Sequence, residues 1–372
     1  NIMSSSRAFF IATSAATLTG FRVDIDNFVS LTGPAVIMML TAAGVLVNLI
    51  AGGMAAVRIL NLPYSDGKIA RWAGAAVGLT MLLGTLLLIG QGDLTARSVL
   101  AAWQGGLAAF GNSGHLLAKA PPAGGWQTQL LLLPLALLGG FGLPVLMELW
   151  DRLRHRRPLS RHASIVLVLT ASVYLLAMLT LVPLNIPMPT KDKPLQAIQV
   201  HDALVTASTA AIDSRSAGIG FDYIRDLPSQ RVAGWFVVLL MIVGAASAGT
   251  AGGLKLNTLA ALWTSARRTL RGEGAGRVLV IAISWVALYF IVTAITFVAL
   301  TALPGGAKMP AQELFFMAVS ATSNVGLTYG PVTLTGPDLF VLSAAMLLGR
   351  LLPLAILWWM AQTTTDADIA VG

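Results

Sequence analysis

Seven long apolar runs constrain this chain most, because each is long enough to cross a bilayer as a helix. They cover residues 33–57, 72–90, 127–150, 163–184, 232–258, 277–302 and 337–360. Lipid leaves no partner for an unpaired backbone group, so such a chain folds as a bundle of helices. Only 11% of the residues are charged, whereas soluble domains carry about a quarter. We therefore expect an all-α multi-pass membrane protein.

The loops between these runs fall into two sets that differ in charge. Loops 58–71, 151–162 and 264–277 hold 12 of the 24 lysines and arginines, which places them in the cytoplasm under the positive-inside rule. This topology accounts for the net charge of +8, so we expect no nucleic-acid partner. Acids gather in the opposite loops: Asp24, Asp26, Asp93, Asp192, Asp202, Asp213, Asp222, Asp226, Glu313 and Asp338. They form either an acidic vestibule that concentrates cations or ordinary solvated loop charge.

Four short segments in the opposite loops are too weakly apolar to span, and each closes on a glycine. They cover residues 9–21, 103–115, 206–219 and 315–327, and they close on Gly20, Gly114, Gly218 and Gly326. A helix over residues 8–18 reaches only about 16 Å, roughly half of the ~30 Å hydrocarbon core. Such a segment can descend to mid-membrane and turn back where protein surrounds it.

The pattern predicts four repeats of helix, re-entrant pore helix and helix in pseudo-four-fold arrangement around one ion pore. The repeats cover 1–60, 61–158, 159–265 with a broken inner helix, and 266–372. The first repeat has no helix before its short segment. We therefore expect an outer helix that precedes Asn1 and is missing from this chain.

The short segments have the chemistry of a cation filter. The C-terminal end of a helix carries partial negative charge, and the carbonyls after it can replace the hydration shell of a cation. Glycine permits backbone conformations that a β-carbon penalises. With 37 glycines in the chain, the spacing of these four is weak support by itself. All four, however, lie on the same predicted side of the membrane and follow a run too weakly apolar to span. The predicted filter residues are Thr17, Leu18, Thr19, Gly20, Gly111, Asn112, Ser113, Gly114, Arg215, Ser216, Ala217, Gly218, Ser323, Asn324, Val325 and Gly326.

Several motifs, in order along the chain, resemble the membrane subunit of the Trk/Ktr/HKT superfamily of potassium transporters. SRSAG at 214–218 is similar to the family's S-R-T-A-G loop, SNVGL at 323–327 to T-V-G-L, TLTGF at 17–21 to T-T-G-L, and FGNSG at 110–114 to F-N-N-A-G. GAASAGTAGGLK at 244–255, GGFGLPVLMEL at 139–149 and GRLLPL at 349–354 resemble its inner helices.

The resemblance implies potassium uptake across the bacterial inner membrane, with K⁺ held by backbone carbonyls of the filter residues and no organic cofactor. It also implies a homodimer in membrane lipid and a cytoplasmic ring of nucleotide-binding regulatory subunits. Gly111, His115 and Asn324 depart from the family pattern, as does TAAGVL at 41–46. These departures leave open a less selective paralogue that conducts K⁺ and Na⁺.

A run of small residues interrupts the fifth apolar run. It consists of Gly244, Ala245, Ala246, Ser247, Ala248, Gly249, Thr250, Ala251, Gly252 and Gly253. The run is either a flexible gate below the filter, tolerated because it lines a cavity, or a site of close helix packing. With the resemblance we favour the gate, with Lys255 either anchoring its end or snorkelling to the inner surface.

Two arginines lie in or beside the expected pore. An arginine near the bilayer centre costs about 2.5–3.5 kcal/mol, so Arg350 should face a polar interior. It serves either as a positive barrier that belongs to the gate or as a structural group, in an ion pair or a clamp on backbone carbonyls. Arg215 is expected to brace the third filter loop, against Asp213 or Asp202.

Other functions remain as rivals at this stage. The pore subunit of a potassium-pumping ATPase shares the four-repeat plan, and a non-conducting membrane sensor could use the same scaffold. An enzyme is not expected, because the chain has no cysteine and its four histidines lack a metal-binding spacing.

Overall fold

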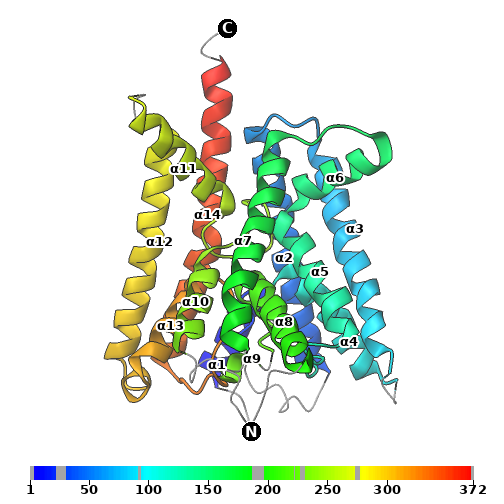
Figure 1. The fold of residues 1–372 in the computed structure, drawn as a ribbon, viewed down its shortest axis with the longest axis vertical. Helices are drawn as coiled ribbons and strands as arrows, with labels where there is room; N and C mark the ends of the chain where they lie inside the picture. The colour runs from blue at the N-terminus through cyan, green and yellow to red at the C-terminus, as the bar shows by residue number, and fades with distance from the viewer. Residues whose placement is uncertain are drawn as a thin grey trace.

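The computed structural model describes residues 4–21, 31–90, 94–186, 197–221, 223–226, 231–272 and 277–369. This part of the chain is helical and contains no strand beyond an isolated bridge between Val243 and Leu254 (Figure 1). The helices are α1 (Ser5–Ala16), α2 (Thr32–Ile59), α3 (Asp66–Gly84), η2 (Thr85–Leu88), α4 (Ala96–Gly111), η3 (Gln127–Leu132), α5 (Leu133–Phe141), α6 (Leu143–His155), α7 (Arg161–Asn185), α8 (Ala197–Ile212), η4 (Asp213–Ala217), α9 (Tyr223–Asp226), α10 (Arg231–Ile242), α11 (Leu256–Leu270), α12 (Arg277–Ala302), η5 (Gly306–Lys308), α13 (Ala311–Thr322) and α14 (Pro337–Ile369).

Five helices in the described part of the chain are long and apolar enough to cross a membrane. They are Thr32–Ile59, Asp66–Leu88, Arg161–Asn185, Leu279–Ala302 and Pro337–Gln362. Large apolar side chains on these helices remain exposed, for example Leu179 at 75% and Ile295 at 63%. In water such exposure would be costly, whereas lipid solvates these side chains directly. The expected all-α polytopic fold is confirmed.

The expected span over 127–150 is not one straight helix. The chain bends by 104° between α5 and α6. Gly142 at the bend has a φ of +80°, and a β-carbon there would lie 2.7 Å from the backbone carbon of Ala248. Pro144, at the start of α6, has no N–H to donate, and this suits the first turn of a new helix. Continuous hydropathy across residues 127–150 concealed this break.

The expected span over 232–258 is also divided. Helix α10 ends at Ile242 and α11 begins at Leu256. The chain between them, residues 243–255, is the intramembrane loop. It folds back on itself, because Gly244 N–H donates to the carbonyl of Leu254 over 2.9 Å and Leu254 N–H donates to that of Ile242 over 2.8 Å. The predicted break of the inner helix is therefore present.

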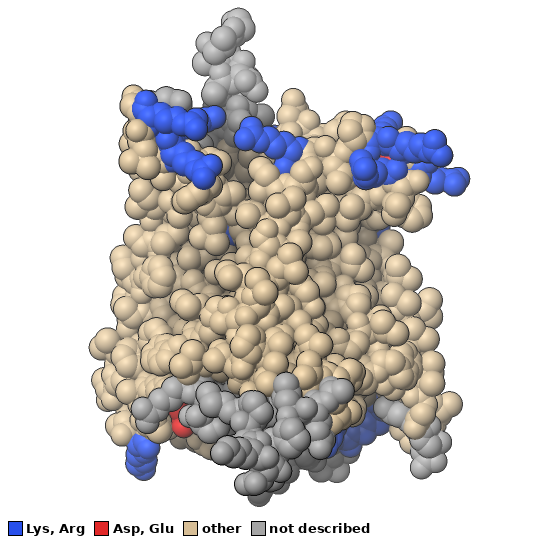
Figure 2. Space-filling model, viewed as in Figure 1, with Lys and Arg blue, Asp and Glu red and all other residues tan. Residues whose placement is uncertain are grey.

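Four short helices, α1, α4, α8 and α13, lie in the half of the molecule that is lowest in Figure 1. Lysine and arginine side chains gather at the opposite end, beside α6 and α11 (Figure 2). The exposed arginines there include Arg152, Arg154, Arg156, Arg157, Arg267, Arg268 and Arg271. This distribution places α6 and α11 on the cytoplasmic side and the short helices towards the outside.

Buried acids hold the cytoplasmic end together. The carboxylate of Glu148 accepts from Ser160 N–H over 2.7 Å and from its hydroxyl over 2.9 Å, which fixes the start of α7. The Tyr64 hydroxyl donates to Asp151 over 3.0 Å. Burial and this bond together raise the pKa of Tyr64 above its usual range. These contacts secure α6 across the ends of the spanning helices.

Glycines on the inner helices α2, α5 and α14 let the short helices pack closely. A β-carbon on Gly44, Gly139 or Gly349 would lie less than 3.0 Å from a carbonyl oxygen at the C-terminal end of a short helix. The three carbonyls belong to Ala16, Phe110 and Thr322, in the same order. Only glycine permits this approach. The C-terminal ends of α1, α4 and α13 are thus held against α2, α5 and α14 near the centre of the bundle.

Candidate functional site

The stretches after the four short helices meet in a closed ring. We name them segment 1 (17–21), segment 2 (112–115), segment 3 (217–221) and segment 4 (323–327). A β-carbon on Gly20 would lie less than 3.0 Å from a backbone atom of segment 2. The same holds for Gly114 against segment 3, for Gly218 against segment 4 and for Gly326 against segment 1. The order around the ring is therefore the order along the chain.

The backbone of these segments adopts an uncommon alternation. All four glycines have positive φ, at +85°, +62°, +61° and +80°. Leu18, Asn112 and Asn324, each two residues before a glycine, are also left-handed, at +57°, +51° and +49°. Alternating left-handed and ordinary residues turn successive peptide groups towards one side. Asparagine tolerates this region well, but a buried leucine there is a strained exception, of a kind found at functional sites.

Two asparagines form hydrogen bonds between the ring and the helices around it. In segment 4, Asn324 Nδ2 donates to the Thr19 hydroxyl over 2.9 Å and to the carbonyl of Met346 over 2.8 Å. In segment 2, Asn112 Nδ2 donates to the carbonyl of Ala136 over 3.0 Å. Both side chains are buried, and their Oδ1 atoms have no hydrogen-bond partner among the described residues. These two oxygens can accept from water or contact a cation.

Not every predicted filter residue lies in the ring. Gly111 is the last residue of α4, where a β-carbon would lie 2.7 Å from Val45 Cγ2, so it lies directly before segment 2 and not in it. Ser323 is the first residue of segment 4 and the C-cap of α13, and its hydroxyl lies 2.6 Å from that of Tyr289. The side chain of Ser216 falls outside the described residues. The remaining predicted residues of the four loops lie in the segments or directly before them.

Arg215 directs its side chain away from the ring. Its Nη2 donates to the carbonyl of Gly244 over 2.8 Å and its Nε to that of Val243 over 3.4 Å. The expected partner Asp213 instead accepts from the N–H groups of Ile219 and Gly220, over 2.7 and 3.1 Å. Arg215 therefore braces the start of the intramembrane loop, and Asp213 holds segment 3.

Thr250 is the point at which the intramembrane loop meets the ring. Its hydroxyl donates to the carbonyl of Phe110 and accepts from Asn112 Nδ2, both over 2.8 Å. Its N–H donates to Gly139 over 3.0 Å. Its carbonyl accepts from Arg350 Nη1 over 2.7 Å. Four polar contacts on one residue fix the loop below segment 2.

Buried cations complete this arrangement. Arg350 is 7% exposed and donates from Nε to the carbonyl of Thr17 over 2.7 Å and from Nη2 to that of Leu18 over 3.3 Å. Lys255 is 8% exposed, and its Nζ donates to the carbonyl of Ala251 over 2.5 Å. Within the described ranges, neither cation pairs with a carboxylate. Lys255 thus anchors the end of the loop.

Below the loop, a cavity of about 540 Å³ lies towards the cytoplasmic end. The loop contributes Ser247 and Lys255 to its wall, α11 contributes Asn257, and α14 contributes Pro353 and Leu357. The loop therefore lies between the ring and a cavity large enough for several waters.

Two of the ten acids predicted for the outer side are buried and bonded within the fold. Asp213 and Asp338 are buried and accept from backbone N–H groups, Asp338 from Gly306 over 3.0 Å. Asp202 is exposed. Asp24, Asp26, Asp93, Asp192 and Asp222 fall outside the described residues, as does the side chain of Asp226. Two of the predicted vestibule acids are therefore structural.

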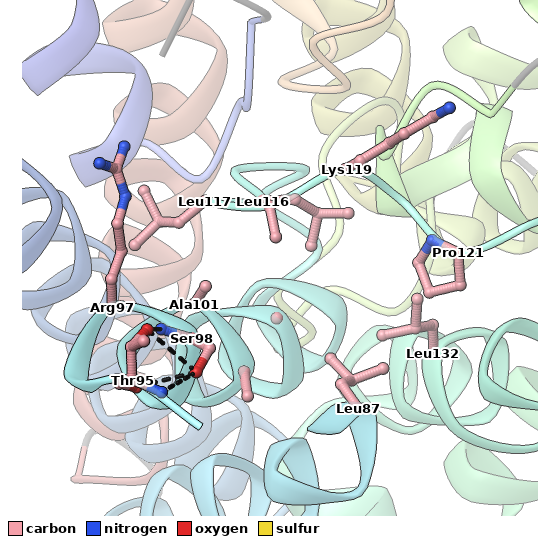
Figure 3. Close-up of a pocket in the computed structure, with 13 residues that line it drawn as sticks. Leu87, Thr95, Arg97, Ser98, Ala101, Leu116, Leu117, Lys119, Pro121 and Leu132 are labelled. Carbon is pink, nitrogen blue, oxygen red and sulfur yellow. Dashed lines mark hydrogen bonds between the residues drawn. The ribbon is translucent and has the colours of Figure 1, made fainter. Parts of the chain in front are cut away.

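A pocket of about 260 Å³ lies beside α4, behind segment 2 (Figure 3). Leu87, Leu116 and Leu132 give it apolar walls, and Arg97 and Lys119 extend from its rim. None of the ring glycines lines it. The pocket is thus separate from the ring.

Comparison with known proteins decides the family. Residues 101–363 match the family model TrkH, described as cation transport protein. The chain belongs to the TrkH family. The predicted relation to Trk and Ktr membrane subunits is confirmed, and this TrkH-family chain is a multi-pass integral protein of the inner membrane.

Individual relatives agree with this assignment. The TrkH-family chain is 29% identical to Ktr system potassium uptake protein B of Bacillus subtilis (strain 168), over 96% of the chain and 86% of that protein. It is 25% identical to the protein of the same name from Vibrio alginolyticus, over 97% and 85%. Its fold is similar to the crystal structure of the potassium transporter TrkH from Vibrio parahaemolyticus, with a TM-score of 0.71 at 17% identity, over 97% of this chain and 78% of that one.

Proposed function

We propose that this TrkH-family chain is the pore-forming subunit of a potassium uptake system, a transporter and not an enzyme. The closed ring of four glycine-containing segments carries the proposal, because it surrounds one axis with backbone from all four parts of the chain. The names of the Bacillus and Vibrio relatives support K⁺ as the transported ion.

The ring would act as the selectivity filter. Carbonyls around Thr19, Ser113, Ala217 and Val325 replace the hydration shell of K⁺, and the C-terminal ends of α1, α4 and α13 add partial negative charge. Positive φ at the glycines supports this role, since successive carbonyls can then face the axis. Neutral carbonyls bind K⁺ without holding it, and this permits rapid passage.

The intramembrane loop would act as the gate. Residues 244–253 lie between the filter and the cytoplasmic cavity, and Arg350, Thr250 and Lys255 hold the loop in place. Arg350 also places a positive charge below the filter, which opposes the exit of a cation. Opening requires the loop to leave at least the contacts of Thr250.

The chain would consist of four repeats, at 1–60, 61–158, 159–265 and 266–372. One recurring bond supports this division: an N–H in each segment donates to a carbonyl five residues earlier, in the short helix or, for segment 3, in η4. The donor–acceptor pairs are Thr19–Ser14, Ser113–Ala108, Gly218–Asp213 and Val325–Ser320. Such repetition of one unusual bond is consistent with a common repeat.

The subunit would function as a homodimer in membrane lipid, with a cytoplasmic ring of nucleotide-binding subunits. The exposed arginines in the last turn of α6 and directly after it, Arg152, Arg154, Arg156 and Arg157, offer this partner a basic docking surface. Replacing Arg154, Arg156 and Arg157 by glutamine should reduce co-purification of the regulatory subunit. It should leave the amount of folded membrane subunit unchanged.

Growth of a potassium-uptake-deficient host at low external K⁺ tests the transport proposal. The wild-type chain should restore growth, whereas Gly218→Ser should not restore selective uptake, because its side chain would displace segment 4. Uptake of Na⁺ measured in parallel distinguishes a K⁺-selective pore from a broader cation pore. Absence of rescue by well-expressed wild type, together with its regulatory partner, would refute the proposal.

A further inference from the structure

Ser14, near the end of α1, lies behind segment 1 and holds its backbone. Its hydroxyl oxygen accepts from Gly20 N–H over 3.1 Å and from Phe21 N–H over 3.0 Å. The same oxygen lies 3.0 Å from Nε2 of His115, the residue after Gly114 in segment 2. Ser14 is fully buried, and His115 is 3% exposed. The contact thus joins two neighbouring segments of the ring.

Hydrogen-bond accounting assigns the direction of this contact. A serine hydroxyl has two lone pairs and one proton. Gly20 and Phe21 occupy both lone pairs, so the Ser14 proton goes to His115 Nε2. The imidazole is then neutral, with its own proton on Nδ1. Without that acceptor, the Ser14 hydroxyl would be a buried donor with no partner, and it would rotate towards another acceptor and weaken its bonds with the two N–H groups.

In segment 3, a carboxylate and not a hydroxyl accepts from the backbone N–H groups. Asp213 takes the role of Ser14, because each side chain accepts from the N–H groups six and seven residues later, although Asp213 stands five and not six residues before its ring glycine. The Asp213 carboxylate accepts from the N–H groups of Ile219 and Gly220 and then from the hydroxyl of Tyr223 over 3.0 Å. A carboxylate has no proton and takes a donor as third partner, whereas a hydroxyl needs an acceptor. We call the side chain that accepts from both N–H groups the clamp. A hydroxyl clamp such as Ser14 needs an acceptor as its third partner, and a carboxylate clamp such as Asp213 needs a donor.

The other two segments lack such a clamp. Ala108 stands at the corresponding position before segment 2 and has no polar side chain. Ser320 stands there before segment 4, and its hydroxyl has no hydrogen-bond partner among the described residues. Only segments 1 and 3, which face each other across the ring, are held in this way within the described structure.

His115 is itself held from a second direction. Gln104 of α4 donates from Nε2 to the carbonyl of His115 over 2.9 Å and contacts the hydroxyl of Thr41 in α2 over 3.3 Å. Gln104 is fully buried. The imidazole therefore projects from a fixed backbone and cannot follow Ser14 freely.

We propose that His115 is a positioning residue for ion selectivity, which holds segment 1 in place by accepting the Ser14 proton across the boundary between segments 1 and 2. This inference rests on the proposed role of the ring as a filter. His115 does not touch the ion. It acts through Ser14 on the peptide groups of Gly20 and Phe21, whose orientation sets the adjoining carbonyls.

Competitive uptake of K⁺ and Na⁺ by the full chain with its regulatory partner tests this role. His115→Phe should lower the K⁺/Na⁺ uptake ratio by roughly two- to tenfold, the factor that corresponds to one hydrogen bond. His115→Gln should restore the ratio, because Oε1 can accept at the place of Nε2. His115→Asn is the matched control, since its oxygen is too short to reach and should behave like phenylalanine.

A double variant separates coupling from general damage. If His115 acts through Ser14, His115→Phe should have little further effect on the ratio in a Ser14→Ala background. An unchanged ratio in both His115→Phe and His115→Asn would overturn the inference, as would additive effects or failure of glutamine to restore the ratio. If His115→Phe does not fold, the glutamine–asparagine comparison decides alone. If the wild-type chain with its regulatory partner takes up no K⁺, the filter proposal itself is refuted.

Discussion

Arg350 of α14 donates from Nη1 to the carbonyl of Thr250 over 2.7 Å. The two residues are 100 positions apart, and this bond joins the last inner helix to the intramembrane loop. The other guanidinium nitrogens donate to segment 1. One side chain thus links the ring and the intramembrane loop, so a change at one can reach the other.

Replacement of Arg350 should separate its charge from its hydrogen bonds. Arg350→Ala removes both and should raise the maximal rate of K⁺ uptake several-fold, since the loop loses a tether and the exit loses a positive charge. Arg350→Lys keeps the charge but cannot reproduce three directed bonds. Initial rates of ⁸⁶Rb⁺ uptake measure both. Equal rates in wild type and Arg350→Ala would contradict the barrier, and a fast lysine variant would assign the effect to the tether.

Thr250→Val should loosen the loop while its volume stays nearly constant. The variant leaves the carbonyl of Phe110 with only the 3.4 Å bond from Asn112 Nδ2 and removes an acceptor from that amide, and loss of a buried partner costs about 1–3 kcal/mol. We expect a lower thermal unfolding midpoint in detergent and faster uptake. Thr250→Ser keeps the hydroxyl and should resemble wild type. A valine variant with unchanged rate and stability would show that the loop is held elsewhere.

Gly326→Ala should abolish selective uptake. Its β-carbon would meet segment 1 at less than 3.0 Å, and alanine is strained at a φ of +80°. Gly78→Ala is the matched control, because nothing lies within 4 Å of its β-carbon on α3. That change should be neutral or stabilise the helix by about 0.5–1 kcal/mol. K⁺ and Na⁺ uptake and the amount of folded protein are measured for both variants. Normal selectivity in Gly326→Ala would contradict the proposal that the ring is the filter.

Asn324→Asp should weaken the joint between segments 4 and 1. Aspartate tolerates the left-handed backbone, but it cannot donate to Thr19 or Met346 as Asn324 does. We expect a loss of about 1–3 kcal/mol in stability and a lower K⁺/Na⁺ uptake ratio. Asn324→Gly, which keeps the backbone but not the donor, should show the same loss of selectivity. A wild-type ratio in both variants would limit the side chain to a structural role.

Topology can be tested without background labelling, because the chain contains no cysteine. Arg154→Cys lies at the basic end and should react with a membrane-impermeant maleimide only after the membrane is opened. Lys308→Cys, in η5 at the other end, should react in intact cells. The reverse pattern would invert the assigned orientation.

Several parts of the fold followed from local patterns. Apolar runs around Thr32–Ile59 and Arg161–Asn185 predict spanning helices, because length and hydropathy are properties of one segment. The loops around Arg154 and Arg268 predict the cytoplasmic side for the same reason. The glycines that end the short segments were identifiable from their context, and all four lie in the ring.

Other parts were not visible in any single segment. The bend at Gly142 interrupts a continuous apolar run, because the backbone of Ala248, more than a hundred residues away, lies against it. Gly111 belongs to the loop motif FGNSG in sequence but completes the last turn of α4. Asp213 looks like a vestibule acid, yet the N–H groups it meets make it a buried acceptor.

The sequence by itself determined the membrane, the helical class, the orientation and the four glycine turns, because these depend on hydropathy, charge and backbone freedom at neighbouring positions. Only the tertiary structure decided that Ser14 meets His115 and that Arg350 meets Thr250. Each of these side chains has several possible partners along the chain. The choice among them depends on which helices pack together, and it fixes the direction of every buried hydrogen bond in the site.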